Sequence, residues 1–204
     1  MLLVVGGQAR KIGKTSLVTA LIAAVPEDGW VAVKITEHAH DEEPYPNTRV
    51  LERTDDYVLL EQTAPDETDT GRYLAAGARR AIWLQVRPER LGGALPAMDR
   101  LLASGENFVL ESSSVLEFVT PALCLILLDP EVAEFKESCR RFLDRADAFV
   151  VRGAGRLPED VPVRGRPVIR TVSPDYPPEA VVRLVRSKVA SGKTAVKDSP
   201  DGDA

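Results

Sequence analysis

The chain has 204 residues, which is enough for one α/β domain with a substantial core and too short for two comfortable ones. Its 26 basic and 31 acidic residues give a formal net charge of −5, so we expect no nucleic-acid partner, because nucleic-acid phosphates are bound by clustered Lys and Arg. No apolar run approaches the ~20 residues that span a bilayer, and the sequence starts directly with a strand pattern. We therefore expect no membrane partner, no signal peptide and a cytoplasmic location.

Strand and helix patterns alternate along almost the whole chain. Apolar strand patterns cover residues 1–6, 30–35, 81–86, 107–110, 122–128, 148–151 and 167–171, and helical patterns cover 15–25, 70–78, 88–103, 131–145 and 178–189. Short strand patterns at 50–52 and 57–61 indicate a hairpin. Near-continuous Val, Ile and Leu strands separated by helices predict an α/β fold, a doubly wound, mostly parallel sheet with helices on both faces. We expect a single domain over residues 1–190 and a polar, disordered tail over 191–204.

The start of the chain has the build of a phosphate-binding loop. An apolar strand at residues 2–5 leads into a glycine-containing loop that ends in Gly13-Lys14-Thr15, and a helical pattern follows. Backbone N–H groups of such a loop and of the first helical turn converge on an anion, Lys14 reaches the terminal phosphates, and the Thr15 hydroxyl is a ligand of Mg²⁺. We predict that the phosphates are held by Gly7, Gln8, Ala9, Arg10, Lys11, Ile12, Gly13, Lys14, Thr15 and Ser16.

This loop departs in length from the usual P-loop pattern. Gln8 stands where the first glycine of that pattern is expected, and counting from Gly7 leaves one intervening residue more than usual before Gly13. A bare Gly-Lys-Thr is common by chance, and the second copy at residues 192–194 follows no apolar strand. We therefore interpret only the first copy as a nucleotide site and assign the second to the tail.

Two acidic residues are candidates for the metal and the chemistry. Glu111 ends an apolar strand and precedes Ser112-Ser113-Ser114, a position from which P-loop proteins hold Mg²⁺ or orient a water. The alternative is a strand-end carboxylate that caps the next helix. Asp69 lies just before a helical pattern, where it is either a helix cap or a second carboxylate linked to Mg²⁺.

Lys34 and the two histidines follow the second apolar strand. A lysine at the end of a buried strand needs an anionic partner, so we expect Lys34 to contact the nucleotide or a substrate. His38 and His40 are two residues apart, and two such ligands without a Cys/His cluster do not make a metal site. We interpret this segment as a polar loop over the ligand.

These motifs, in this order, resemble the MobB proteins, the GTP-binding adaptors of molybdopterin-guanine dinucleotide biosynthesis. The resemblance covers residues 1–150 in the order of elements and is most specific at residues 69–78, which read DTGRYLAAGA. It implies that Lys14, Thr15, Asp69 and Glu111 are nucleotide and Mg²⁺ residues. The longer loop is more similar to dethiobiotin synthetase and the cobyrinate amidases, which bind ATP. Related GTPases often read the base with an Asn-Lys pair where this chain has Arg152-Gly153, so GTP and ATP both stay open.

The leading hypothesis is a MobB-like protein that binds GTP or ATP with Mg²⁺, forms a homodimer and supports molybdenum cofactor maturation with a protein partner. Lys14 and Glu111 would be the catalytic residues of a slow NTPase, with a partner supplying missing positive charge. One alternative is an ATP-dependent ligase or kinase related to dethiobiotin synthetase, in which Lys34 and residues 112–114 hold a small carboxylate. Another is a nucleotide-gated protein-binding module whose loop at residues 36–68 changes order with the nucleotide.

Overall fold

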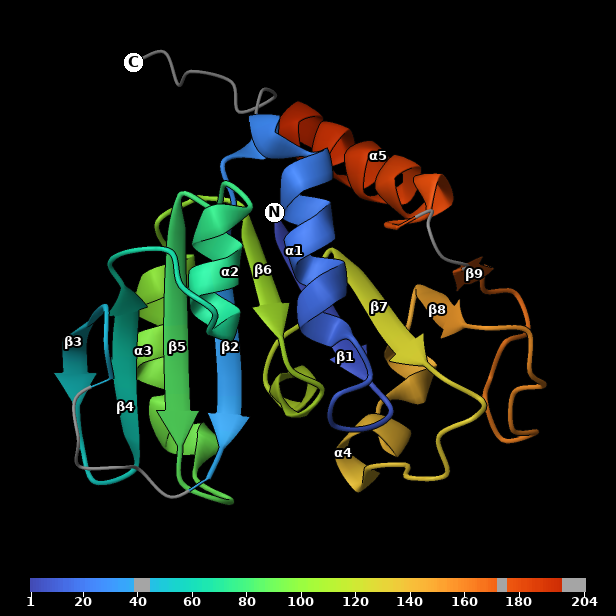
Figure 1. The fold of residues 1–204 in the computed structure, drawn as a ribbon, viewed down its shortest axis with the longest axis horizontal. Coiled ribbons are helices and arrows are strands. Elements are labelled where there is room, and N and C mark those ends of the chain that lie inside the picture. Colours follow the sequence, from blue (N-terminus) through green and yellow to red (C-terminus); the bar gives the residue numbers. More distant parts are fainter. Residues whose placement is uncertain (39–44, 172–175, 196–204) are drawn as a thin grey trace, which may run out of the picture.

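The computed structural model describes residues 1–38, 45–171 and 176–195. In this part of the chain, nine strands form one sheet in the order β3-β4-β5-β2-β6-β1-β7-β8-β9 (Figure 1). The strands are β1 (Leu2–Gly7), β2 (Val31–Glu37), β3 (Thr48–Arg53), β4 (Tyr57–Gln62), β5 (Arg80–Val86), β6 (Phe108–Glu111), β7 (Leu123–Leu128), β8 (Ala148–Arg152) and β9 (Val168–Thr171). The order places β1, which leads into the glycine loop, between β6 and β7.

The sheet is parallel from β5 to β9 and antiparallel only at one edge. β3 and β4 form a hairpin, and β4 pairs antiparallel with β5. The remaining neighbours all pair in parallel. This confirms the doubly wound, mostly parallel fold. The hairpin that the sequence predicted within residues 36–68 is thus present, in the segment that the gating hypothesis expects to change order with the nucleotide.

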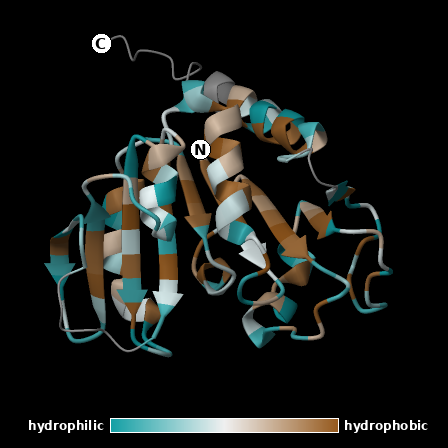
Figure 2. Cartoon of the chain, viewed as in Figure 1, coloured by the Kyte–Doolittle hydropathy of each residue, from teal (hydrophilic) through white to brown (hydrophobic). Residues whose placement is uncertain are grey.

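Helices cover both faces of the sheet and divide the core in two. α1 (Lys14–Ala24), α2 (Asp69–Ala75) and α5 (Glu179–Ala195) lie on one face, and α3 (Leu95–Leu102) and α4 (Glu137–Arg140) lie on the other (Figure 1). Neighbouring strand residues alternate between the two cores, so that Leu3 and Val5 pack beneath α1 while Val4 packs on the opposite side. The strands are therefore apolar along their length, as Figure 2 shows for β6 and β7. Short 3₁₀ segments cover Pro26–Asp28, Leu91–Ala94, Ser114–Glu117 and Leu143–Arg145.

Besides α2, which ends at Ala75 rather than at residue 78, two predicted helices are shorter than their sequence patterns. The pattern at 88–103 becomes a 3₁₀ turn and α3, because Glu89 adopts a left-handed φ of 65° and a Gly92-Gly93 pair follows. The pattern at 131–145 becomes only α4 and a 3₁₀ turn. In the second case the backbone of residues 132–136 bonds to Gln8, which removes it from helical pairing.

The C-terminal boundary also differs from the sequence prediction. α5 continues through Ala195, so residues 191–195 of the predicted tail are helical, and the rest of that tail lies outside the described residues. Within the described ranges, no helix is both long enough and apolar enough to cross a membrane.

Candidate functional site

The carboxyl ends of β1, β2 and β6 lie side by side. The register sets Glu111 opposite Val5 of β1 and opposite Lys34 of β2. A cavity of about 900 Å³ opens at this edge and is lined by the glycine loop, the end of β2, the start of α2 and residues 111–114. Ligands of open α/β sheets bind at this edge of the sheet, so this cavity is the candidate functional site.

The glycine loop turns tightly around the start of α1. Lys11 and Gly13 have left-handed φ values of 55° and 100°. Gly13 is the residue before α1 and offers no side chain to the free N–H groups of the first helical turn, which leaves them available to an anion. A Cβ on Gly7 would lie 2.9 Å from the Lys14 side chain, so the lysine can fold over the loop only because Gly7 is a glycine.

Lys14 is held inside this loop. Its Nζ donates a hydrogen bond to the carbonyl oxygen of Ala9 at 2.8 Å. Burial lowers the pKa of Lys14, the Glu111 carboxylate acts against this, and the nearby ammonium groups of Lys34 and Lys136 lower the pKa further. An anion in the loop would offset both effects, which is the expected property of a phosphate-binding lysine.

The loop residues divide into two groups. Seven of the residues that the sequence predicted as phosphate-binding line the cavity: Gly7, Arg10, Lys11, Gly13, Lys14, Thr15 and Ser16. The side chains of Gln8, Ala9 and Ile12 instead point away from it, because Ala9 and Ile12 are buried in the core and Gln8 bonds to another loop. These three residues can act on a ligand only through their backbone and the shape they give the loop.

Gln8 joins the glycine loop to the segment after β7. Its Nε2 donates to the carbonyl oxygens of Val132 (2.6 Å) and Glu134 (3.2 Å), and its Oε1 accepts from the Asp129 N–H at 3.0 Å. The Lys136 N–H donates to the Gln8 carbonyl oxygen at 2.8 Å. The glutamine at the position of the usual first glycine is thus a structural connector.

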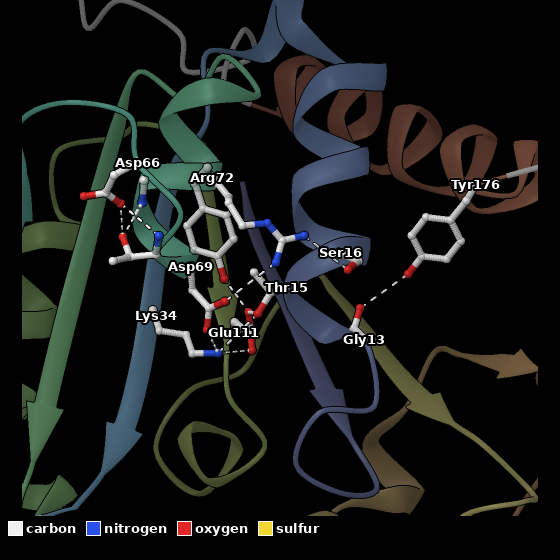
Figure 3. A network of polar contacts seen from close by, with 12 residues as sticks. Gly13, Thr15, Ser16, Lys34, Asp66, Asp69, Arg72, Glu111 and Tyr176 are labelled. Carbon is white, nitrogen blue, oxygen red and sulfur yellow. Dashed lines mark hydrogen bonds and ion pairs between the residues drawn. The ribbon is translucent and has the colours of Figure 1, made fainter.

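On the opposite side, Glu111 is the centre of a polar network (Figure 3). Its Oε2 accepts hydrogen bonds from the Thr15 hydroxyl at 2.8 Å and from the Tyr73 hydroxyl. Its Oε1 pairs with the Lys34 ammonium, whose Nζ also lies 3.0 Å from Asp69 Oδ2 and 3.4 Å from Thr15 Oγ1. The network therefore brings together Thr15, Lys34, Asp69 and Glu111, all four of which the sequence assigned to the nucleotide or its metal.

Burial and charge shift the pKa in opposite directions at Lys34 and in the same direction at Tyr73. Burial alone would lower the pKa of Lys34, but the carboxylates of Glu111 and Asp69 outweigh it and raise the pKa. Burial raises the pKa of the Tyr73 hydroxyl, and the adjacent Glu111 carboxylate raises it further. Both groups therefore stay protonated near neutral pH and donate to the carboxylates.

The start of α2 aims Asp69 at this network. Thr68, not Asp69, is the helix cap, since its side chain accepts from the Gly71 N–H. Asp66 fixes this turn by accepting from the Thr68 N–H at 2.9 Å, and a Cβ on Gly71 would lie only 2.0 Å from Asp66 Oδ1. With the cap supplied by Thr68, the Asp69 carboxylate is left for Lys34.

Three further residues contribute to the site, and two of them, Lys136 and Tyr73, had no prior prediction. Lys136 reaches the cavity from the loop before α4, and burial together with the neighbouring Arg10 lowers its pKa. Ser113 accepts a hydrogen bond from the Gly7 N–H at 3.0 Å and so ties β6 to the loop. Tyr73 lies in the segment DTGRYLAAGA, which was the available sequence signal for it, whereas Lys136 falls in a pattern that indicated an ordinary helix.

The donors present at the site suit a hard divalent cation. Among residues 1–38, 45–171 and 176–195 there is no group of three or more His, Cys, Asp or Glu side chains arranged for a metal ion. His38 stacks on Trp83 with ring centroids 6.1 Å apart, and His40 lies outside the described residues. The hydroxyl of Thr15 and the carboxylates of Glu111 and Asp69 are oxygen donors around one ammonium group, and Mg²⁺ prefers such donors in combination with water and phosphate.

Comparison with solved structures agrees with this fold. No profile of a known protein family matches the chain, and a search of curated proteins finds no relative. Among solved structures, the chain is similar to HypB from Helicobacter pylori in complex with nickel, with a TM-score of 0.51, 14% identity and coverage of 99% of this chain and 91% of that one. The chain has a P-loop NTPase fold. This class is defined by the glycine loop and the strand order, together with the similarity to HypB.

Two further solved structures match part of their own length. LpxK from Aquifex aeolicus in complex with ATP matches with a TM-score of 0.48 and 18% identity, over 83% of this chain and 53% of LpxK. Zn(II)-bound YjiA GTPase from E. coli matches with a TM-score of 0.42 and 14% identity, over 85% of this chain and 57% of YjiA. The chain thus spans little more than half the length of either protein.

Proposed function

We propose that the protein binds a nucleoside triphosphate, GTP or ATP, together with Mg²⁺ and hydrolyses it slowly. The observation that carries this proposal is the bond between the Thr15 hydroxyl at the start of α1 and the buried Glu111 at the end of β6. It joins the phosphate loop to a carboxylate across two neighbouring parallel strands, where a metal-bound phosphate would sit.

Each residue has a definite task in this proposal. The loop amides and Lys14 bind the β- and γ-phosphates, and Thr15, Asp69 and Glu111 hold the metal directly or through water. When bound, Mg²⁺ would neutralise charge that develops on the phosphates. Glu111 then has the position to orient an attacking water, because its two oxygens face Thr15 and Lys34.

We expect slow hydrolysis because, in the described part of the chain, no arginine or lysine of the loop besides Lys14 is held in place to stabilise the transition state at the γ-phosphate. Arg10 and Lys11 are exposed on the loop, and within residues 1–38, 45–171 and 176–195 no ion pair or side-chain hydrogen bond holds either of them over a γ-phosphate. A cation supplied in trans raises the hydrolysis rate of other NTPases by roughly 10³–10⁵-fold. We therefore include a homodimer or a protein partner in the proposal, as the source of that charge.

The particular role we propose is that of a MobB-type protein in molybdenum cofactor biosynthesis. Its support is the resemblance at residues 69–78 and at Glu111, together with the position of Asp69 and Glu111 on the same ammonium group. Two stretches far apart in sequence would then serve one function, the binding of the metal and the γ-phosphate.

A second candidate is an ATP-dependent ligase or kinase that acts on a small carboxylate. It is favoured by Lys136, which faces the same cavity as Lys34 and the hydroxyls of residues 112–114. A half-buried ammonium of lowered pKa is stabilised by an anion, and an acceptor carboxylate beside the γ-phosphate would supply it.

A thermal-shift panel tests both candidates. The ligands are ATP, GTP, their diphosphates, a molybdopterin-type ligand and small dicarboxylates, each with and without Mg²⁺. Stabilisation by Mg²⁺-triphosphate supports nucleotide binding, and a preference for GTP together with the molybdopterin ligand supports the MobB-type role. Additional stabilisation by a dicarboxylate only when ATP is present supports the ligase. No stabilisation by any triphosphate contradicts the whole proposal.

A further inference from the structure

The Lys34 ammonium lies among the three side chains that the proposed function assigns to the metal. Its Nζ contacts Glu111 Oε1, lies 3.0 Å from Asp69 Oδ2 and lies 3.4 Å from Thr15 Oγ1. These oxygens come from β6, α2 and α1, so the ammonium is the point at which three separate elements meet (Figure 3).

This position has an electrostatic reason. The Glu111 side chain is only 1% exposed and would be an uncompensated buried charge without a cation beside it. Asp69, which is 43% exposed, adds a second negative charge on the cavity side. One ammonium group between the two carboxylates offsets much of this cost in the protein without ligand.

The same oxygens cannot serve the ammonium and a divalent cation together. A metal bound by Thr15, Asp69 and Glu111 would occupy the space of the Lys34 Nζ, and two cations that close repel each other strongly. The lysine side chain has a flexible four-carbon stem, so its ammonium can leave while β2 keeps its place in the sheet.

We propose that Lys34 is an internal substitute for Mg²⁺, which neutralises Glu111 and Asp69 in the empty site and is displaced when metal and triphosphate bind together. The inference rests on the proposed function and adds a regulation to it. Metal alone brings two positive charges and must expel a paired ammonium, whereas a metal-triphosphate also brings the negative charge that the displaced ammonium needs. Metal binding therefore depends on the nucleotide, and Lys34 is the residue that couples the two.

Mn²⁺ binding to the full chain without nucleotide tests the proposal, with free Mn²⁺ measured by electron paramagnetic resonance. We expect wild-type protein to bind Mn²⁺ weakly and Lys34→Met to bind it at least about tenfold more tightly, because the competing ammonium is gone. The matched control is Lys136→Met, which removes the same charge from the same cavity but no contact to the three oxygens. Equal gains in the two variants, or tight Mn²⁺ binding by wild type, would overturn the proposal.

Lys34→Met leaves Glu111 unpaired, so two safeguards accompany it. The double variant Lys34→Met/Glu111→Gln removes both charges and is expected to recover the stability that the single variant loses. A crystal structure of wild type with Mg²⁺ and a non-hydrolysable triphosphate gives an independent result, in which Lys34 should no longer contact Glu111. If that complex forms and Lys34 stays paired with both carboxylates, the proposed role of Lys34 in place of Mg²⁺ is wrong, while nucleotide binding stands. If wild type binds no triphosphate at all, the proposed function fails first.

Discussion

The two flanks of the glycine loop are built by different means. On the β6 flank, polar and charged side chains of three other elements gather around Glu111. Thr15 of α1, Tyr73 of α2 and Lys34 of β2 contact it directly, and Asp69 of α2 joins through Lys34. On the β7 flank, the Gln8 amide and backbone groups of residues 129–136 hold the loop. In our proposal the first flank exchanges one cation for another, whereas Gln8 is held on the second flank by neutral hydrogen bonds. The comparison indicates that the chemistry belongs to the β6 flank and the shape of the loop to the β7 flank.

The largest effect is expected where both flanks converge, at Lys14. Lys14→Ala should abolish stabilisation by Mg²⁺-triphosphate, which amounts to about 2.7 kcal/mol at a ligand concentration of about 100 times Kd. The ammonium is the positive charge that the loop is expected to direct toward the phosphates, and its bond to the Ala9 carbonyl oxygen lies within the loop itself. Thermal unfolding with and without nucleotide measures the loss, and Lys188→Ala on α5 is the control. If the stabilisation persists in Lys14→Ala, the loop is not the phosphate site.

The β6 flank is tested by Glu111→Gln. We expect the rate of hydrolysis to fall by about 100-fold or more, with a change in nucleotide Kd of only a few-fold, because the carboxylate acts mainly in the transition state. Single-turnover phosphate release and calorimetry give the two quantities. Glu37→Gln removes another carboxylate that lines the cavity and should have a much smaller effect on the rate. Equal losses in rate and in affinity would reassign Glu111 from the chemistry to the structure.

The β7 flank is tested by Gln8→Ala, which should lower stability more than it lowers nucleotide affinity. Three hydrogen bonds are lost, and at about 1 kcal/mol each the free energy of unfolding should fall by about 3 kcal/mol. Gln85→Ala is a matched control, since Gln85 is equally buried and its amide nitrogen has no hydrogen-bond partner within the described ranges. Urea unfolding of the two variants isolates the hydrogen bonds. A loss no larger than that of the control would mean that Gln8 is only a space-filling residue.

The smallest effect concerns the turn that positions Asp69. Hydrogen bonds from Thr68 and Asn47 lower the pKa of Asp66 from 3.8 to about 2. A carboxyl whose folded pKa is lowered stabilises the fold above its unfolded pKa, and this contribution is lost as the pH falls from about 4 to about 2. Asp66→Asn should therefore flatten the loss of stability in this acid range, with exposed Glu179→Gln as the control. Parallel acid-unfolding curves for wild type and Asp66→Asn would contradict this account.

The parts of the site that depend on neighbours in sequence were predictable. The first apolar strand, the glycines and Lys14-Thr15 follow one another in the sequence. The near-continuous apolar strands predict a sheet that is covered on both faces. Glu111 was predictable as well, because a carboxylate at the end of a buried strand must lie at the same edge as the loop. For Asp69 the residues alone left a helix cap and a metal-linked carboxylate both open, and the structure shows that Thr68 provides the cap.

The parts that depend on long-range pairing were not predictable. The apolar periodicity of residues 131–145 indicates a helix, but residues 132–136 bond to Gln8, more than a hundred positions away. Because of this incorrect helix prediction, Lys136 was not recognised as a residue of the cavity, since a helix would have placed it on an ordinary polar face. Lys34 clearly needed an anionic partner, yet the sequence could not say that both Asp69 and Glu111 provide it.

The tight packing of Gly71 against Asp66 also has an evolutionary consequence. Because a Cβ at this position would lie 2.0 Å from Asp66 Oδ1 and 2.5 Å from the Asp66 nitrogen, any other residue forces this turn apart. Divergent homologues that keep the same turn should therefore carry an aspartate and a glycine five positions apart, even where the phosphate loop has drifted. That spacing can be used to search for distant homologues that a search for Gly-Lys-Thr alone would miss.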